Sequence, residues 1–357
     1  MKRAAAFAVT IIVLCGMLSG CDFWTAGDYL SVTAHEPYQE VNGETVVEVT
    51  SYQQLRNALS DMVNNCTESG IISITSFSHA TVDYYVNTAI NFVQKSTALG
   101  AYAVEKITYE IGTKRGASVV AFEIDYCHSR AEILSMQNVQ NKDEMITAIT
   151  TALDSNEVYL ALRTENYEAL DFIQLVQDYM SEHPDVVMEF PKVGAFLYPE
   201  RGTERIVELT FTYQTERESL RKMQERVAEV FTSAELYVKE TTQVKDIYSR
   251  LFSFLMERND YTLQTSITPA YSLLQHGVGD SRAFANVYAA MCRRAGLDCS
   301  VVSGTRDANP WCWNLVRYRG KYYHVDLLRC SDNDEFAMYT DADMTGYVWD
   351  YSAYPAS

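Results

Sequence analysis

The sequence predicts an α+β protein in which two small repeated modules precede a larger C-terminal domain. Similar segments begin at Ser51 and Asn141, and residues 119–126 resemble residues 206–213. The two stretches that these segments bound are therefore interpreted as two copies of one unit. From residue 244 to residue 326 a different series of helical and extended patterns follows. We expect each repeated module to be a few-stranded sheet with two helices on one face.

The composition excludes some classes of function. At 357 residues the chain is longer than one typical domain. Hydrophobic residues make up 47% of it and charged residues 21%, which is enough apolar material for packed cores. The 47 acidic residues outnumber the 29 basic ones, which gives a net charge of −18. Because nucleic-acid binding begins with Lys and Arg neutralising phosphates, we expect no nucleic-acid partner.

The N-terminus predicts an export signal. Lys2 and Arg3 precede an apolar run over residues 4–14, which is too short for a bilayer-spanning helix. The tetrad Leu-Ser-Gly-Cys at residues 18–21 resembles a bacterial lipobox, which implies a lipoprotein signal peptide at residues 1–20 and lipidation of Cys21. An ordinary secretory signal is the alternative. We therefore expect a bacterial protein held by this lipid at the extracytoplasmic face of the cell membrane.

The rest of the chain divides into four parts. Residues 21–45 are polar and turn-prone, as in a spacer. The two α+β modules are expected at residues 46–137 and 138–226, and the C-terminal domain at residues 227–357. The modules contain no convergent polar cluster, so we interpret them as binding or spacing units rather than catalysts.

The cysteines predict neither a metal site nor a cofactor. Six lie beyond the signal peptide and the lipid site, namely Cys66, Cys127, Cys292, Cys299, Cys312 and Cys330. No CxxC pair or His/Cys spacing typical of zinc occurs. An extracytoplasmic location permits disulfides, but their pairing stays open.

The C-terminal part carries an ordered series of motifs. Apolar residues recur at helical spacing from residue 244 to residue 256. A second helix opens near Ser281 and is stopped by Gly296, and a turn at Arg319-Gly320 joins two later strands. In order, the motifs are Gly279-Asp280-Ser281, Trp311-Cys312-Trp313-Asn314 and His324-Val325-Asp326.

This series resembles the bacterial transglutaminase-like superfamily, whose members have a papain-like core. The resemblance covers roughly residues 240–357 and implies that fold for the C-terminal domain. It also implies that the family's catalytic cysteine, histidine and aspartate correspond to Ser281, Trp311 and Asp326. The first two positions therefore depart from the family pattern, and only the aspartate is kept.

The two departures predict loss of catalysis. The family nucleophile is a thiolate at a helix N-terminus, whereas a serine needs an adjacent base to remove its proton. Trp311 cannot be that base, because an indole donates a hydrogen bond but accepts no proton. We expect Ser281 to serve as a helix N-cap and the indole N–H of Trp311 to bond to Asp326.

Three functional hypotheses remain open. In the first, the domain is non-catalytic and binds a peptide, a cell-wall fragment or a partner protein in a degenerate cleft. The candidate cleft residues are Trp311, Trp313, Asn314 and His324, with core packing as the favoured interpretation of Trp313. In the second, a weak hydrolase or acyltransferase uses Ser281 with His324 as base and Asp326. In the third, the protein is a structural spacer at the cell surface with a filled cleft.

Overall fold

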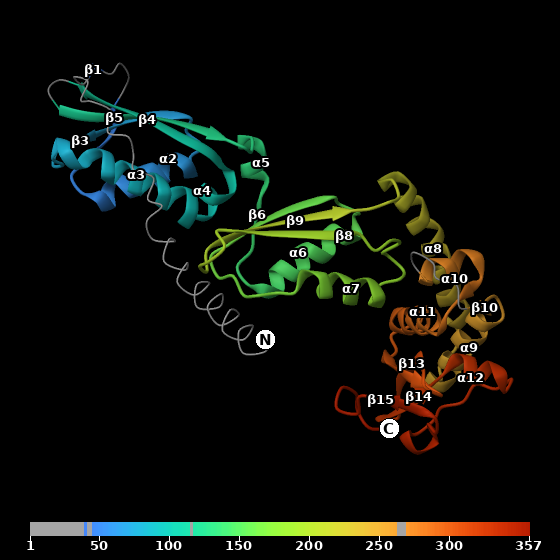
Figure 1. The fold of residues 1–357 in the computed structure, drawn as a ribbon. Coiled ribbons are helices and arrows are strands. Elements are labelled where there is room, and N and C mark those ends of the chain that lie inside the picture. Colours follow the sequence, from blue (N-terminus) through green and yellow to red (C-terminus); the bar gives the residue numbers. More distant parts are fainter. Residues whose placement is uncertain (1–38, 41–44, 115–116, 263–268) are drawn as a thin grey trace, which may run out of the picture.

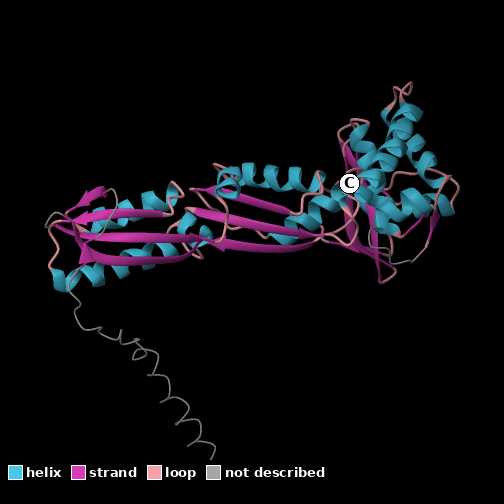
Figure 2. Ribbon diagram, turned by 90° about the horizontal axis from the view of Figure 1, so that it is seen from above, coloured by secondary structure: helices cyan, strands magenta, loops and turns pink. Residues whose placement is uncertain are grey.

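The computed structural model describes residues 39–40, 45–114, 117–262 and 269–357, arranged as three units in a row (Figure 1). The predicted signal peptide and Cys21 lie outside the described residues. The strands of the first two units run along the length of the molecule (Figure 2). Helices and sheets are combined in every unit, which confirms the α+β class. Among the described residues we find no helix with the length and apolar character needed to cross a bilayer.

The first unit is a five-stranded sheet with helices packed on it. Its elements are β1 (Gln39–Glu40), β2 (Thr45–Val49), α2 (Tyr52–Asn64), β3 (Ser69–Ile74), α3 (His79–Ser96), α4 (Ala98–Ala103), β4 (Val104–Lys114), β5 (Ala117–Tyr126) and α5 (Arg130–Ser135). The strand order is β1-β4-β5-β3-β2, with β2 parallel to β3 and β5 antiparallel to both β3 and β4. Leu55 of α2 and Val86 of α3 are fully buried in one core with Ile72 and Phe122 of the sheet.

The end of the predicted spacer belongs to this sheet. Gln39 and Glu40 pair in parallel with Gly112 and Thr113 at the far end of β4. The expectation of a plain spacer up to residue 45 was wrong for these two residues, and β2 begins at Thr45. An edge strand presents unpaired N–H and C=O groups, and these bind a neighbouring extended segment whatever its side chains.

The second unit repeats the topology of strands β2 to β5 of the first. Its elements are β6 (Gln137–Asn138), α6 (Lys142–Asp154), β7 (Tyr159–Thr164), α7 (Phe172–Glu182), β8 (Lys192–Tyr198) and β9 (Arg205–Thr212). The order β6-β7-β9-β8, with β6 parallel to β7 and the other pairs antiparallel, repeats β2-β3-β5-β4. Ser51 and Asn141 cap α2 and α6 in the same way, each accepting a hydrogen bond from the third helical residue.

The first two units are joined by packed side chains. Helix α4 lies against β8 and β9 of the second sheet. Ala161 and Ile206 point away from the core of their own unit and join that of the first. The hydroxyls of Tyr102 and Tyr159 are 2.6 Å apart, and the ring of Tyr102 meets Tyr198 edge to face at 5.5 Å. Since this contact is a continuous apolar core, we expect the two units to move together.

The third unit is a helical layer on one antiparallel sheet. Its elements are α8 (Arg217–Val238), α9 (Val244–Met256), β10 (Asp260–Tyr261), α10 (Pro269–His276), β11 (Val278–Gly279), α11 (Ser281–Arg294), β12 (Cys299–Arg306), β13 (Asn309–Tyr318), β14 (Lys321–Val325), α12 (Leu327–Asp332), the 3₁₀ turn η2 (Asp341–Asp343) and β15 (Tyr347–Trp349). The strand order is β14-β13-β12-β15. Most of α11 is buried between this sheet and helices α8, α9 and α10.

Helix α8 corrects the predicted boundary between residues 226 and 227. The helix runs through that point without interruption. Leu220, which precedes the predicted boundary, is fully buried in the same core as Phe231 and Tyr288 of the C-terminal unit. The C-terminal unit therefore begins near the start of α8, because the apolar face of one continuous helix packs into one core.

Candidate functional site

Ser281 is the first residue of α11, but it does not cap that helix. The carboxylate of Asp280 does so, accepting a hydrogen bond from the backbone N–H of Ala283 at 2.8 Å. The Ser281 hydroxyl oxygen accepts instead from the backbone N–H of Cys312 on β13, at 3.2 Å, and the residue is only 8% exposed. The expected N-cap role was therefore wrong. Ser281 ties the start of the helix to the neighbouring strand.

Trp311 occupies the position next to this contact, and its indole N–H donates to the Oδ2 atom of Asp326 at 2.9 Å. This bond was expected from the sequence and is confirmed. The same oxygen accepts from the hydroxyl of Tyr347 at 2.5 Å and lies 3.4 Å from Nη1 of Arg306. Burial, reinforced by the charge of Asp326, raises the pKa of Tyr347 well above the usual tyrosine value, so this hydroxyl stays a donor.

Both carboxylate oxygens of Asp326 are occupied. The Oδ1 atom caps α12, accepting from the backbone N–H groups of Leu328 at 3.1 Å and Arg329 at 3.3 Å. Asp326 is 1% exposed, so each of these bonds is made away from water. A buried carboxylate with five donors around it holds the domain together.

His324 is held in a separate buried cluster. Its Nδ1 atom accepts from the indole N–H of Trp313 at 2.8 Å, and its Nε2 atom lies 2.9 Å from Oδ1 of Asp341. These two contacts fit the neutral tautomer with its proton on Nε2. Burial lowers the pKa of His324, although the hydrogen bond to Asp341 opposes that shift. Neither ring nitrogen is left to receive a proton from a nucleophile.

The sheet itself separates His324 from Ser281. His324 pairs directly opposite Leu315, which places it on the Trp313 face of the sheet. Asn314 points to the other face, where its Nδ2 donates to the carbonyl of Ala285 in α11 at 2.9 Å. Since Ser281 begins α11, the predicted serine, histidine and aspartate do not form a catalytic group in this structure.

Three of the four predicted cleft residues are buried. Trp313 is 1% exposed and meets Tyr347 and Trp349 edge to face, so it fills the core, as the favoured interpretation held. Asn314 and His324 are exposed to a similarly small extent. Only Trp311 is partly exposed, so it alone among the four can contact a ligand in this conformation.

Two functional candidates were not found from the sequence. Tyr261 on β10 is 40% exposed, and the centre of its ring lies 5.6 Å from that of Trp311. The guanidinium of Arg306 lies 5.3 Å from the Trp311 ring. We call these three side chains the aromatic ledge. No motif marks Tyr261 or Arg306, because their approach to Trp311 depends on how β10 and β12 pack around β13.

The pH dependence of stability should report on His324. Protonation of Nδ1 would place its N–H against the indole N–H of Trp313. The hydrogen bond between the two rings would then be lost. Because the folded pKa is lowered, stability is complete above the unfolded value of about 6.5 and falls as the pH drops below it. We expect the thermal midpoint to fall between about pH 7.5 and pH 5.5.

The variant His324→Asn keeps an acceptor for Trp313 without this titration, so it should flatten that part of the profile. The exposed His276 supplies the control, since His276→Asn should leave the profile unchanged. Thermal denaturation followed by circular dichroism measures both. Equal slopes for wild type and His324→Asn would contradict the assignment.

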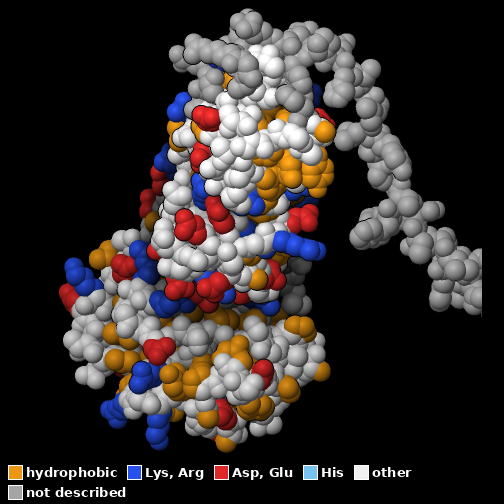
Figure 3. All heavy atoms as spheres, turned by 90° about the vertical axis from the view of Figure 1, so that its left-hand side faces the viewer, with side chains coloured by type: hydrophobic (Ala, Val, Ile, Leu, Met, Phe, Trp, Pro, Cys, Tyr) orange, Lys and Arg blue, Asp and Glu red, His pale blue; other side chains and the backbone are white. Residues whose placement is uncertain are grey.

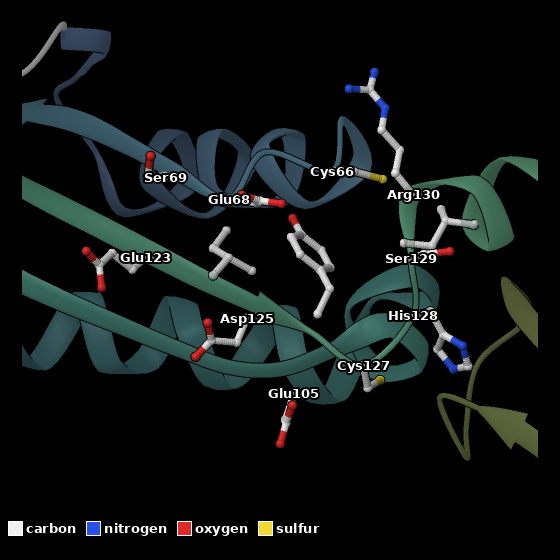
Figure 4. Close-up of a pocket in the computed structure, with 13 residues that line it drawn as sticks. Cys66, Glu68, Ser69, Glu105, Glu123, Asp125, Cys127, His128, Ser129 and Arg130 are labelled. Carbon is white, nitrogen blue, oxygen red and sulfur yellow. The ribbon is translucent and has the colours of Figure 1, made fainter.

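Five cavities in the described part of the chain have volumes of about 310 to 900 Å³, and none of these five is lined by Ser281, Trp311 or Asp326. One, of about 770 Å³, lies in the first unit, where Figure 4 shows carboxylates, Glu68 and Asp125 among them, around its opening. A smaller one of about 350 Å³, lined by Asn156 and Tyr213, occupies the corresponding end of the second unit.

The family model of the transglutaminase-like superfamily matches residues 231–327. This range contains Ser281, Trp311 and Asp326, and it begins within α8. No curated protein matches the chain.

Three solved structures align with parts of this chain at low similarity. A transglutaminase aligns with 54% of this chain and 58% of its own length, at 11% identity and a TM-score of 0.27. A proposed cysteine protease from Cytophaga hutchinsonii aligns over 44% and 70%, at 14% identity and a TM-score of 0.27. A proposed protease from Parabacteroides distasonis aligns over 72% and 40%, at 10% identity and a TM-score of 0.24. This chain thus spans less than two thirds of the transglutaminase. The family match and the ordered motifs within it make residues 231–327 of the C-terminal unit a transglutaminase-like domain.

Proposed function

We propose that this protein is a lipid-anchored, extracytoplasmic member of the superfamily whose transglutaminase-like unit binds a ligand without catalysis. The observation that carries the proposal is the set of partners of Asp326 and Ser281. The carboxylate is filled by structural donors, and the serine oxygen faces a backbone N–H. An acyl transfer needs a base that takes the nucleophile's proton, and none of these partners can accept one.

The aromatic ledge supports a binding role. Tyr261 and Trp311 present ring surface to solvent beside the positive charge of Arg306. Aromatic rings stack on sugars and on peptide side chains. The guanidinium of Arg306 is already paired with Asp326 and Asp332, so it contributes its contact with the Trp311 ring rather than an unpaired charge. Cell-wall fragments and peptides both offer surfaces that such rings can contact. We propose such a fragment or peptide as the ligand, and Tyr261 and Trp311 as its contacts.

The absence of catalysis is tested on the purified soluble portion of the protein, lacking residues 1–21. We expect no incorporation of an amine into a glutamine-containing peptide and no peptide cleavage above background, with or without iodoacetamide. Losing two members of a catalytic unit leaves only weak background rates. An active transglutaminase in the same assay is the control. Turnover that iodoacetamide abolishes would contradict the proposal.

Ligand binding is tested by co-sedimentation of the same portion with purified peptidoglycan. We expect wild type to sediment, and Tyr261→Ala to weaken binding at least about tenfold, because truncating an aromatic residue that dominates an interface costs about 2 kcal/mol or more. Tyr84→Ala removes a tyrosine that is 68% exposed in the first unit and should have no effect. A loss of binding in both variants would show that the ledge is not the site.

The structural-spacer hypothesis retains one supporting observation, namely that none of the five cavities is lined by the former triad. It predicts that wild type and Tyr261→Ala both stay in the supernatant in the presence of peptidoglycan. The weak-hydrolase hypothesis has lost its base, because both nitrogens of His324 are occupied on the far side of the sheet.

A further inference from the structure

The second sheet has an open edge. Strand β8 is last in the order β6-β7-β9-β8, so among the residues that the structure describes no strand pairs with one side of its backbone. Lys192 begins this strand, and Pro199, which has no N–H to donate, directly follows its last residue. The stretch available for pairing with a further strand is therefore limited to residues 193–198.

The equivalent edge in the first unit already carries an added strand. Strand β4 holds the place in the first sheet that β8 holds in the second, and β1 pairs with its outer side in parallel. The added segment is short, polar and acidic, with Gln39 and Glu40 as its paired residues. Because Val119 is equivalent to Ile206, the residues that pair with β1 correspond to Tyr198 and Pro199 of the second unit. An added strand on β8 would therefore have to pair nearer to the start of the strand than β1 does on β4.

An apolar groove borders the open edge. Its volume is about 900 Å³, and it is lined by Ala101 of α4 and by Ala195, Phe196 and Leu197 of β8. The ring of Phe196 is 54% exposed, on a strand whose backbone is also accessible. An exposed phenylalanine beside unpaired backbone groups is an aggregation hazard unless a partner covers it.

The charge around the groove is locally positive in an acidic protein. Lys95 and Arg201 line it together with a single acid, Glu200, and Lys192 lies on the strand itself. Lys95, Lys192 and Arg201 are exposed, and they form no ion pair with any residue that the structure describes. On the end of the molecule that Figure 3 presents, acidic and basic side chains are interspersed. Unpaired cations beside an apolar groove favour an acidic ligand with apolar side chains.

We propose that β8 is a docking edge that takes an extended, acidic peptide segment of a partner protein as an added strand. Backbone hydrogen bonds to residues 193–198 would hold the segment, an apolar side chain would cover Phe196, and carboxylates would pair with Lys95 and Arg201. This is the recognition mode in which main-chain bonds give affinity and side-chain pockets give specificity. The site is separate from the aromatic ledge and does not depend on it.

The test uses the soluble portion of the protein and a fluorescein-labelled synthetic peptide with the sequence of residues 36–44, which includes β1 and three glutamates. Fluorescence anisotropy should show saturable binding that weakens as salt is added. Hydrogen exchange followed by mass spectrometry should show slower exchange in β8 when the peptide is bound. A peptide with its glutamates replaced by lysine should bind at least about tenfold more weakly.

Substitutions along β8 and its groove test whether the peptide binds at this edge. Phe196→Glu and the double change Lys95→Glu with Arg201→Glu should each weaken binding at least about tenfold. Ile173→Glu, at a side chain that is 56% exposed on α7 of the same unit, is the matched control and should bind as wild type does. If Phe196→Glu does not fold, the double charge reversal still tests whether the peptide binds at β8.

Three results would overturn the proposal. These are no peptide binding, slower exchange confined to elements other than β8, and unchanged affinity in the double charge reversal. Self-association of the protein that Phe196→Glu abolishes would also overturn it, because β8 would then pair with a second copy.

Discussion

Replacing Asp326 with alanine is expected to destabilise the C-terminal unit by about 3–5 kcal/mol, the cost of removing one partner from a buried charged network. The indole of Trp311, the hydroxyl of Tyr347 and the first turn of α12 would all lose their acceptor. Arg306 would lose its buried counter-charge as well. Few single substitutions in this protein should lower the free energy of unfolding as much, because this one side chain bonds to β13, α12 and β15.

The measurement is urea denaturation of the purified soluble portion, followed by tryptophan fluorescence. Asp332→Ala is the matched control, since Asp332 also faces Arg306, at 3.9 Å, but its side chain is 71% exposed. Surface ion pairs contribute little, so the control should change stability by less than about 1 kcal/mol. A similarly small effect for Asp326→Ala would show that its buried bonds are replaced by water and that the carboxylate is not a structural centre.

Replacing Cys21 with alanine is expected to abolish lipid anchoring, so that the protein is either released from the membrane fraction or keeps its signal peptide uncleaved. The proposed anchor is the lipid on this residue, and acyl chains contribute about 0.8 kcal/mol for each buried CH₂ group. The described residues contain no helix suited to cross the membrane in its place. Fractionation of cells with immunoblotting measures the distribution, and mass spectrometry of the wild-type N-terminus identifies the lipid.

The control for this prediction is Cys66→Ala, which removes a partly exposed free thiol from the first unit and should leave the protein in the membrane fraction. The Cys21→Ala product should be released or keep its signal peptide uncleaved. A cleaved Cys21→Ala product that stays with the membrane would show that another feature anchors the protein.

Much of the C-terminal unit could be predicted from local sequence patterns. The helix expected over residues 244–256 has these bounds as α9, because its apolar residues recur at helical spacing. The turn at Arg319-Gly320 is present with positive φ at both residues, as a tight hairpin requires. The bond from Trp311 to Asp326 was also predicted, since a half-buried indole needs an acceptor and the family spacing offered only one.

The predictions that were wrong concern contacts between segments that are far apart in the sequence. Ser281 was expected to cap its own helix, but Asp280 is the better acceptor there and the serine bonds to β13 instead. His324 was a candidate base two residues before Asp326. The twist and pairing of the sheet place it beside Trp313, while Asp341 arrives from a later turn. A single sequence contains no signal for such a neighbour.

The sequence by itself determined the class of each unit, the order of the motifs and the presence of a serine and a tryptophan where cysteine and histidine were expected, because these depend on residue type and on spacing along the chain. The tertiary structure decided what replaced them. Only folding brings Tyr347 and Arg306 to Asp326, sets Tyr261 beside Trp311 and leaves β8 as an open edge. Hydrogen bonds and ring contacts act over a few ångströms between residues that are far apart in the chain, so their partners are fixed by packing.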